Sequence, residues 1–239
     1  MLIYKNFNHN RSIKTIEDWF SECPPKRKKI QWKDGRSAKE FARYMTLKLP
    51  DVPIELQNVL CKYSIINQIL VAPEYVTNFK SKGFGSGEGR NHDSLILLEN
   101  AVIGIEAKAD EILGKYYSNI KISDTDNHKL RYQGLYSALL DGNIDGKLRY
   151  QLVTASVGTI LEAIDRKKPN AILLIITFLK DGCYDERKVR TNLEDIEYFI
   201  AKFKKRKGGS LLAKIAVDNN ISFYIEHIII NSDGDNIAK

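Results

Sequence analysis

The segment NHDSLILLENAVIGIEAKADE (91–111) places three charged residues, Asp93, Glu106 and Lys108, inside a run that is otherwise mostly apolar. Its two halves are rich in aliphatic and β-branched residues, and the polar pair Glu99-Asn100 separates them. This pattern predicts two β-strands joined by a tight hairpin turn. Because removing a charge from water is costly, the three charged side chains indicate a site and not only a core.

A turn centred on Glu99-Asn100 places Asp93 directly opposite Glu106. Directly opposed residues share one face of a sheet, with Cβ atoms about 4.5–5.5 Å apart. Because side chains alternate along a strand, Lys108 lies on the same face as Glu106. Two carboxylates at this spacing suit a hard divalent cation, so we expect Asp93 and Glu106 to bind Mg²⁺ or Mn²⁺.

A metal ion at this position can polarise a phosphodiester, stabilise the charge of the transition state and lower the pKa of a bound water. Lys108 would orient that water, help to deprotonate it, or neutralise the oxyanion. The alternative is that Lys108 forms a plain ion pair with the acids at the edge of the sheet, because Glu-x-Lys is a common tripeptide.

Asp93 and the tripeptide Glu106-Ala107-Lys108 resemble the signature of the PD-(D/E)xK nuclease superfamily, in which an acidic residue starts one strand and (D/E)-x-K ends the next. One departure is His92, where the superfamily often has proline. The segments GRSAKEFA, GIEAKADE and RYQLVTAS are also similar, in this order, to a group of bacterial domains of that superfamily with no established substrate. Together these similarities cover much of residues 35–180.

The resemblance implies a restriction-endonuclease-like αβββαβ core with a mixed central sheet, and a Mg²⁺-dependent nuclease that cuts DNA. It also implies that the helix after the hairpin supplies a catalytic residue, for which Gln151 is the candidate and Arg149 and Tyr150 are the alternatives. Further acids can join such sites. By position these are Glu55, Asp110 and Glu111.

The rest of the chain fits an α/β fold of one domain, 1–239. Residues 1–52 are expected to be an N-terminal helical portion and residues 53–180 the core. Within the core, EYVTNF (74–79) is typical of a first strand and the apolar NAILLIITFL (170–179) of a buried central strand. Residues 181–239 are expected to add a C-terminal helix-strand extension.

The chain has 37 Lys and Arg against 30 Asp and Glu, and a net charge of +7 favours a polyanionic partner. Basic residues cluster in KRKK (26–29) and KFKKRK (202–207), and a nucleic-acid groove would require both clusters to flank one site. Such clusters are more often solvated surface. The candidate nucleic-acid contacts are Lys26, Arg27, Lys28, Lys29, Arg90 and Arg149.

No apolar run reaches the ~18–20 residues of a membrane span, and the first residues lack the pattern of a signal peptide. We therefore expect a cytoplasmic protein with no membrane partner. Cutting both strands of DNA would favour a homodimer. The alternative function is a catalytically inert module that binds nucleic acid or takes part in assembly on a nuclease-like scaffold.

Overall fold

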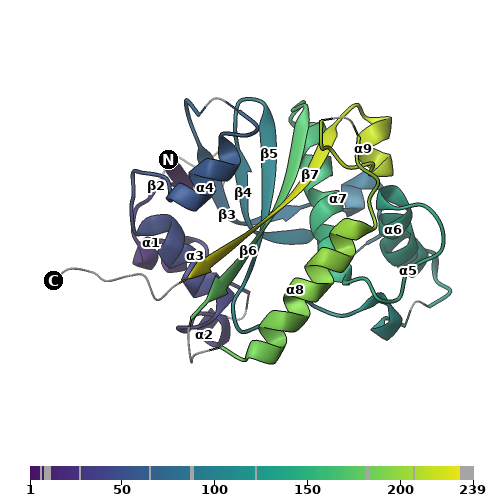
Figure 1. The fold of residues 1–239 in the computed structure, drawn as a ribbon, viewed down its shortest axis with the longest axis horizontal. Helices are drawn as coiled ribbons and strands as arrows, with labels where there is room; N and C mark the ends of the chain where they lie inside the picture. Colours follow the sequence, from purple (N-terminus) through teal and green to yellow (C-terminus); the bar gives the residue numbers. More distant parts are fainter. Residues whose placement is uncertain are drawn as a thin grey trace.

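The computed structural model describes residues 1–5, 7, 12–26, 28–64, 66–86, 89–121, 123–180, 184–206 and 208–231, apart from the side chain of Lys29. Within these residues one mixed sheet runs in the order β2-β1-β3-β4-β5-β6-β7 (Figure 1). The strands are β1 Leu2–Tyr4, β2 Ser12–Ile13, β3 Leu70–Thr77, β4 Arg90–Leu97, β5 Ala101–Lys108, β6 Asn170–Leu179 and β7 Ser222–Asn231. The expected α/β class with a mixed sheet is confirmed.

The sheet contains both kinds of pairing, and its N-terminal strand β1 is parallel to β3. β3, β4 and β5 pair antiparallel, whereas β5, β6 and β7 pair parallel. Parallel neighbours require crossover connections, and helices supply them (Figure 1). The helices are α1 Ile16–Glu22, α2 Lys28–Gln31, α3 Ser37–Thr46, α4 Ile54–Leu60, α5 Asp126–His128, α6 Leu135–Leu139, α7 Tyr150–Asp165, α8 Glu186–Ala201 and α9 Lys214–Asp218, with a π-helical segment Lys129–Gly134 before α6.

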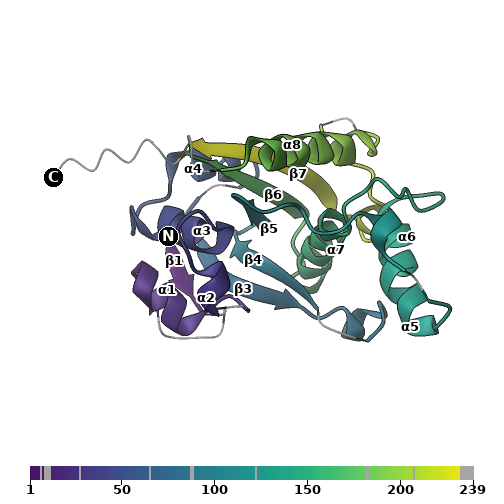
Figure 2. The same ribbon diagram turned by 90° about the horizontal axis from the view of Figure 1, so that it is seen from below.

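Helices cover both faces of the sheet. One core lies between the sheet and α1, α3 and α4, and the other lies between the sheet and α6 to α9 (Figure 2). All eight residues of β5 are therefore buried. Burial on both faces explains why β5 and β6 are almost continuously apolar and do not alternate with polar residues. In the part of the chain described, no helix has the length and apolar character that a membrane crossing requires.

The N-terminal portion differs from the expectation of a helical segment. Two short strands join the sheet there: β1 pairs with β2 and with β3. Their apolar residues Ile3 and Ile13 are buried in the core beneath α1 and α3. Helix α1 begins only after Thr15, whose hydroxyl accepts the N–H of Asp18 at 3.1 Å. Within the portion expected to be helical, the described residues before Thr15 thus include two strands, and capping begins the first helix after it.

Residues 53–180 contain, in order, α4, β3, β4, β5, α7 and β6. This is the expected order of elements, with α5, the π-helical segment and α6 inserted between β5 and α7. The C-terminal part follows as α8, α9 and the edge strand β7. The hairpin β4–β5 therefore lies in the middle of the sheet, where helices on both sides can supply side chains to it.

Candidate active site

The hairpin β4–β5 has the predicted register. Ser94 pairs with Ile105, and continuing this ladder by one residue places Asp93 opposite Glu106. The turn is at Glu99-Asn100, as expected. The predicted register is therefore confirmed for residues 94–97 of β4 against residues 102–105 of β5.

Glu106 is the centre of the site. Its side chain is fully buried, and its carboxylate accepts hydrogen bonds from Arg90, Lys108 and Gln151. Gln151 Nε2 lies 2.6 Å from Glu106 Oε1. These partners come from the start of β4, the end of β5 and the first turn of α7. The two strands of the hairpin and the distant helix α7 thus converge on one carboxylate, and Gln151, expected only from the resemblance, is among the contacts.

Asp93 joins the same cluster through the backbone of β5. Its Oδ2 accepts the N–H of Ala107 at 2.6 Å, which closes the space between the two strands. Its negative charge also acts on Lys108 and Arg90, and it opposes the loss of their protons. Asp93 is therefore the half-buried anion of a site that contains two buried cations.

Burial lowers the pKa of Lys108, and the charge of Asp93 opposes this effect. Its ammonium donates to the carbonyl oxygen of Ala107 at 3.0 Å as well as to Glu106. Burial likewise lowers the pKa of Arg90 to about 10. Lys108 is therefore a better proton donor or acceptor near neutral pH than an exposed lysine would be.

The side chains of β3 and β4 change from one face of the sheet to the other at Glu74 and Asp93. Ile96 packs in the core beneath the N-terminal helices, and strict alternation would direct His92 to the same side. His92 instead lies against α7, because Glu74 takes a left-handed conformation with φ +47° at the position opposite Asp93. The same switch carries Arg90 to the α7 face, where it reaches the site.

His92 fills the contact between the sheet and α7. Its ring is fully buried, and a Cβ atom added at Gly104 or Gly158 would lie about 3.0 or 2.8 Å from it. Nε2 forms a hydrogen bond with Thr77 Oγ1 at 3.2 Å. Burial holds the pKa of His92 well below its usual range. A neutral, packed imidazole is a structural group, so we assign it no role in binding phosphate.

Glu74 is a third acid beside the site, and the sequence reasoning missed it. Burial raises its pKa to about 7, the charge of Asp93 adds to this effect, and Asn91 Nδ2 donates to its Oε2 at 2.7 Å. Its only signal was a carboxylate in a strand-like run, which we placed at the start of the strand. In the structure β3 begins at Leu70, so Glu74 lies within it.

Glu74 makes stability dependent on pH. The unfolded chain releases this proton near the ordinary value of 4.5, whereas the folded protein keeps it up to about pH 7. The folded state therefore binds more protons between these values, and its free energy of unfolding falls as the pH rises through them. We expect Glu74→Gln to gain up to about 3 kcal/mol relative to the wild type between pH 4.5 and pH 8. Urea denaturation of both proteins across this range measures the difference.

The exposed Glu99 on the hairpin turn offers a matched control, because Glu99→Gln removes one carboxylate without changing a buried group. Its stability relative to the wild type should vary little over the same range. A Glu74→Gln difference that does not change with pH would show that Glu74 titrates normally in the folded protein.

Arg149 has a different place from the one expected. It is buried, its Nε donates to Asp195 Oδ2 at 2.6 Å, and its Nη1 donates to the carbonyl oxygen of Gly114 at 2.8 Å. The guanidinium also lies 3.5 Å from the centre of the Tyr116 ring. These contacts join the start of α7 to α8, so Arg149 has a structural position and does not present its charge to a nucleic acid.

The two basic clusters do not flank one site. Lys26 and Lys28 are exposed near α2, while Arg27 and the side chain of Lys29 lie outside the described residues. Lys205 lies at the amino end of β7, because it bridges to Leu211, which bridges to the first residues of that strand. The two clusters belong to separate elements, because α2 precedes α3 whereas residues 202–206 follow the carboxyl end of α8 (Figure 1). The condition for a continuous basic groove is therefore not met by the described residues.

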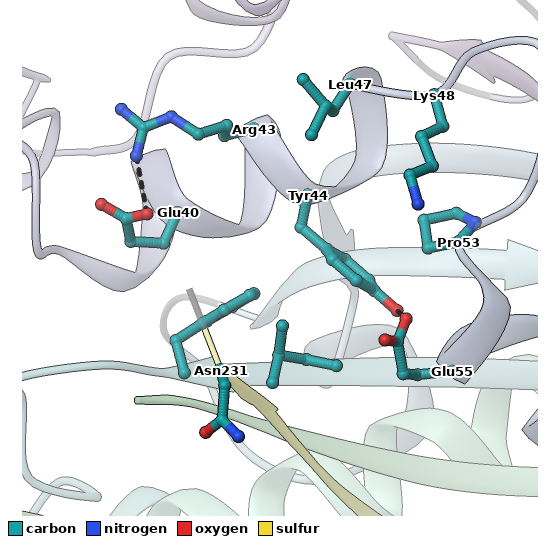
Figure 3. Close-up of a pocket in the computed structure, with 10 residues that line it drawn as sticks. Glu40, Arg43, Tyr44, Leu47, Lys48, Pro53, Glu55 and Asn231 are labelled. Carbon is teal, nitrogen blue, oxygen red and sulfur yellow. Dashed lines mark hydrogen bonds and ion pairs between the residues drawn. The ribbon is translucent and has the colours of Figure 1, made fainter. Parts of the chain in front are cut away.

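Glu55 lines a separate cavity of about 210 Å³ between α3, α4 and the ends of β6 and β7. Figure 3 shows the hydroxyl of Tyr44 meeting the Glu55 carboxylate, and the hydrogen bond is 3.3 Å long. Phe178, which also lines the cavity, belongs to the core beneath the N-terminal helices. Since Glu106 faces α7, Glu55 lies on the other side of the sheet from the site.

Asp110 and Glu111, the other candidate acids, hold helix starts in place. The Asp110 carboxylate accepts the N–H of Asp185 at 3.0 Å, just before α8. The Glu111 carboxylate accepts the N–H of Ser37, the first residue of α3, at 3.2 Å. Carboxylates are favoured at helix N-termini, which explains both positions without a metal ion.

The metal ligands that the site offers are the carboxylates of Asp93 and Glu106. In the described part of the chain, no group of three or more His, Cys, Asp or Glu side chains is arranged to hold a metal ion. Mg²⁺ nevertheless needs only one or two carboxylates, because it keeps several waters. The donor chemistry thus fits a hard cation, which would replace Arg90 or Lys108 at Glu106.

A family model described as "Domain of unknown function (DUF6946)" matches residues 12–232, so the chain belongs to this family. Comparisons with curated proteins and with solved structures gave no match. Because the family description names no activity, conclusions about function depend on the chemistry of the site.

Proposed function

We propose that this member of the DUF6946 family is a Mg²⁺- or Mn²⁺-dependent nuclease that hydrolyses phosphodiester bonds of DNA, on a restriction-endonuclease-like core of the PD-(D/E)xK type. The observation that carries the proposal is the convergence of Lys108, Gln151 and Arg90 on the carboxylate of Glu106, with Asp93 in register beside it. The order α4-β3-β4-β5-α7-β6 and the net charge of +7 also support it.

In this proposal Asp93 and Glu106 hold the metal ion, which supplies Lewis-acid activation of the phosphodiester and of water. Lys108 would orient the attacking water, and in its neutral form, which burial favours, it would accept the proton that the water loses as its oxygen bonds to phosphorus and the P–O bond to the leaving oxygen breaks. Gln151 keeps the Glu106 carboxylate in one orientation through its 2.6 Å hydrogen bond. Arg90 balances the negative charge of Glu106 through one nitrogen, and its Nε, without a partner among the described residues, would be available to a phosphate.

The test is cleavage of plasmid and single-stranded DNA by the purified protein with Mg²⁺ or Mn²⁺. We expect cleavage that EDTA prevents and that Lys108→Met reduces about 10²–10⁴-fold, the usual contribution of an acid-base group. Methionine retains the length of the apolar stem, so the fold should persist, and circular dichroism checks it. Lys168→Met, at an exposed amine that donates to a backbone carbonyl by the hairpin turn, is the matched control.

Two results would contradict this assignment. Wild-type protein that cuts no DNA substrate with either ion would remove the activity itself. Full activity in Lys108→Met would instead show that another residue positions the water.

The second candidate is an inert module that binds nucleic acid or takes part in assembly. The observation in its favour is that Glu106 is fully buried and already neutralised by two cations. A calorimetric Mn²⁺ titration separates the two functions. A catalytic site binds Mn²⁺ saturably and loses this binding in Glu106→Gln, whereas an inert module binds DNA equally well in EDTA and takes up no ion.

A further inference from the structure

Two arginines that act on each other, one of them bound to Glu106, have N–H groups that no acceptor in the described residues satisfies. Arg90 Nε and Arg131 Nη1 are both buried, and neither has a hydrogen-bond partner within the described residues. The side chain of Arg90 is only 10% exposed. Buried donors of charged groups are normally paired, because an unpaired one forfeits its interaction with water. Such a pair indicates an acceptor that the described residues do not supply.

Arg131 is held in place without an anion. Its Nε donates to the hydroxyl of Tyr150 at 2.9 Å, and its guanidinium lies 4.7 Å from the centre of the Phe79 ring. No carboxylate of the described residues lies within 4.0 Å of it, in contrast to the buried Arg149, which is paired with Asp195. The π-helical segment that carries Arg131 is a rare conformation that often occurs at functional sites.

The two guanidinium groups act on each other and on the same phenol. The guanidinium of Arg131 is near enough for its positive charge to act on Arg90. Burial raises the pKa of Tyr150, and the charges of both arginines oppose this change. Tyr150 therefore stays protonated and can donate its own hydrogen. Like charges in a low-dielectric region repel, and a bound anion would remove that repulsion.

We propose that Arg90 and Arg131, together with the hydroxyl of Tyr150, form a subsite for a phosphate group next to the Asp93–Glu106 site. A tetrahedral phosphate offers several acceptor oxygens, and guanidinium groups match its geometry with paired N–H donors. This inference rests on the proposed function, because it assigns the subsite to the backbone phosphate of the nucleic-acid substrate. It also gives Arg131, absent from the sequence-based candidates, a direct part in binding.

Residues 83–86, a turn-rich segment before β4, contact the segment that leads into Arg131. Gly85 has φ +77°, and a Cβ atom there would lie 2.8 Å from the carbonyl oxygen of Asn127. Ser86 Oγ, next along the loop, donates to the Asn127 side chain at 2.7 Å. The loop thus lies directly against the segment that leads into Arg131.

The test measures binding of a fluorescent single-stranded oligonucleotide by anisotropy in EDTA, over a series of NaCl concentrations. We expect Arg131→Gln to weaken binding about 10-fold and to reduce the slope of log K against log[NaCl] by about one. Arg166→Gln is the matched control. Arg166 also donates to a tyrosine, Tyr75, and lies over an aromatic ring, but at the other end of α7. This control should retain the wild-type slope.

Unchanged affinity and slope in Arg131→Gln would overturn the subsite. If this variant does not fold, Arg131→Lys replaces it, because lysine retains the charge without the paired donors. Arg131→Lys should bind the oligonucleotide with intermediate affinity, and wild-type affinity in Arg131→Lys would also overturn the subsite. If inorganic phosphate competes with the oligonucleotide, the subsite binds a terminal or free phosphate. If inorganic phosphate does not compete and the variant still loses binding, the subsite binds an internal phosphodiester. Because EDTA removes the metal ion, this binding is measured independently of cleavage. A protein that binds as expected but cuts nothing would refute only the catalytic proposal.

Discussion

Asp93→Asn is expected to reduce metal-dependent cleavage by about 10³-fold while the protein remains folded. The substitution removes the negative charge that a divalent cation requires. It retains an oxygen that can accept the Ala107 N–H, which Asp93 accepts at 2.6 Å in the structure. Catalysis and folding are therefore separated in one variant. Cleavage rates under single-turnover conditions, with thermal unfolding in parallel, measure both effects.

Asp124→Asn is a suitable control for Asp93→Asn. Asp124 is fully exposed and 3.7 Å from the amine of Lys129, so its loss removes only a weak surface pair. The control should cut DNA at the wild-type rate. If Asp93→Asn also retained that rate, the carboxylate would be needed only to close the gap between β4 and β5, and the metal site would have to lie elsewhere.

The sequence was sufficient for the parts of the fold that local patterns determine. The buried strand expected at residues 170–179 has those limits in the structure. The centre of the hairpin turn determined the register, because opposed strands pair by simple counting from it. The N-terminal strands could not be predicted this way, since β1 has three residues and β2 has two, and each is stable only through its neighbours in the sheet.

The site was predicted in part, and the misses have a common physical cause. Glu106 and Lys108 follow from alternation along β5. Arg90 reaches them only because the side chains of β3 and β4 change face at the level of Glu74. A glutamate in the left-handed conformation has no sequence signature comparable to that of glycine. Arg149 was misplaced because a basic residue before a helix has the same sequence appearance whether it meets a phosphate or, as here, a carboxylate on another helix.

Glu106→Ala is expected to lower the free energy of unfolding by about 3–5 kcal/mol, since it leaves two buried cations without their anion. Arg90 and Lys108 both donate to this carboxylate, and their side chains are 10% and 7% exposed. Urea denaturation at pH 7 in EDTA measures the effect without any contribution from a metal ion. Glu99→Ala, at the exposed turn of the same hairpin, should change stability by less than about 0.5 kcal/mol.

The double variant Glu106→Ala/Lys108→Met tests whether the loss comes from unpaired charge. Removing Lys108, one of the two cations left without an anion, should recover part of the stability. The coupling energy between Glu106 and Lys108 should be about 0.5–3 kcal/mol. If the free energy of unfolding of Glu106→Ala is within about 1 kcal/mol of the wild-type value, water already solvates Arg90 and Lys108 in solution. The site would then be open before substrate arrives. Because Glu106 contributes to stability as well as to the proposed chemistry, loss of cleavage in its variants is ambiguous. Asp93 and Lys108 are therefore the residues on which the catalytic proposal has to be decided.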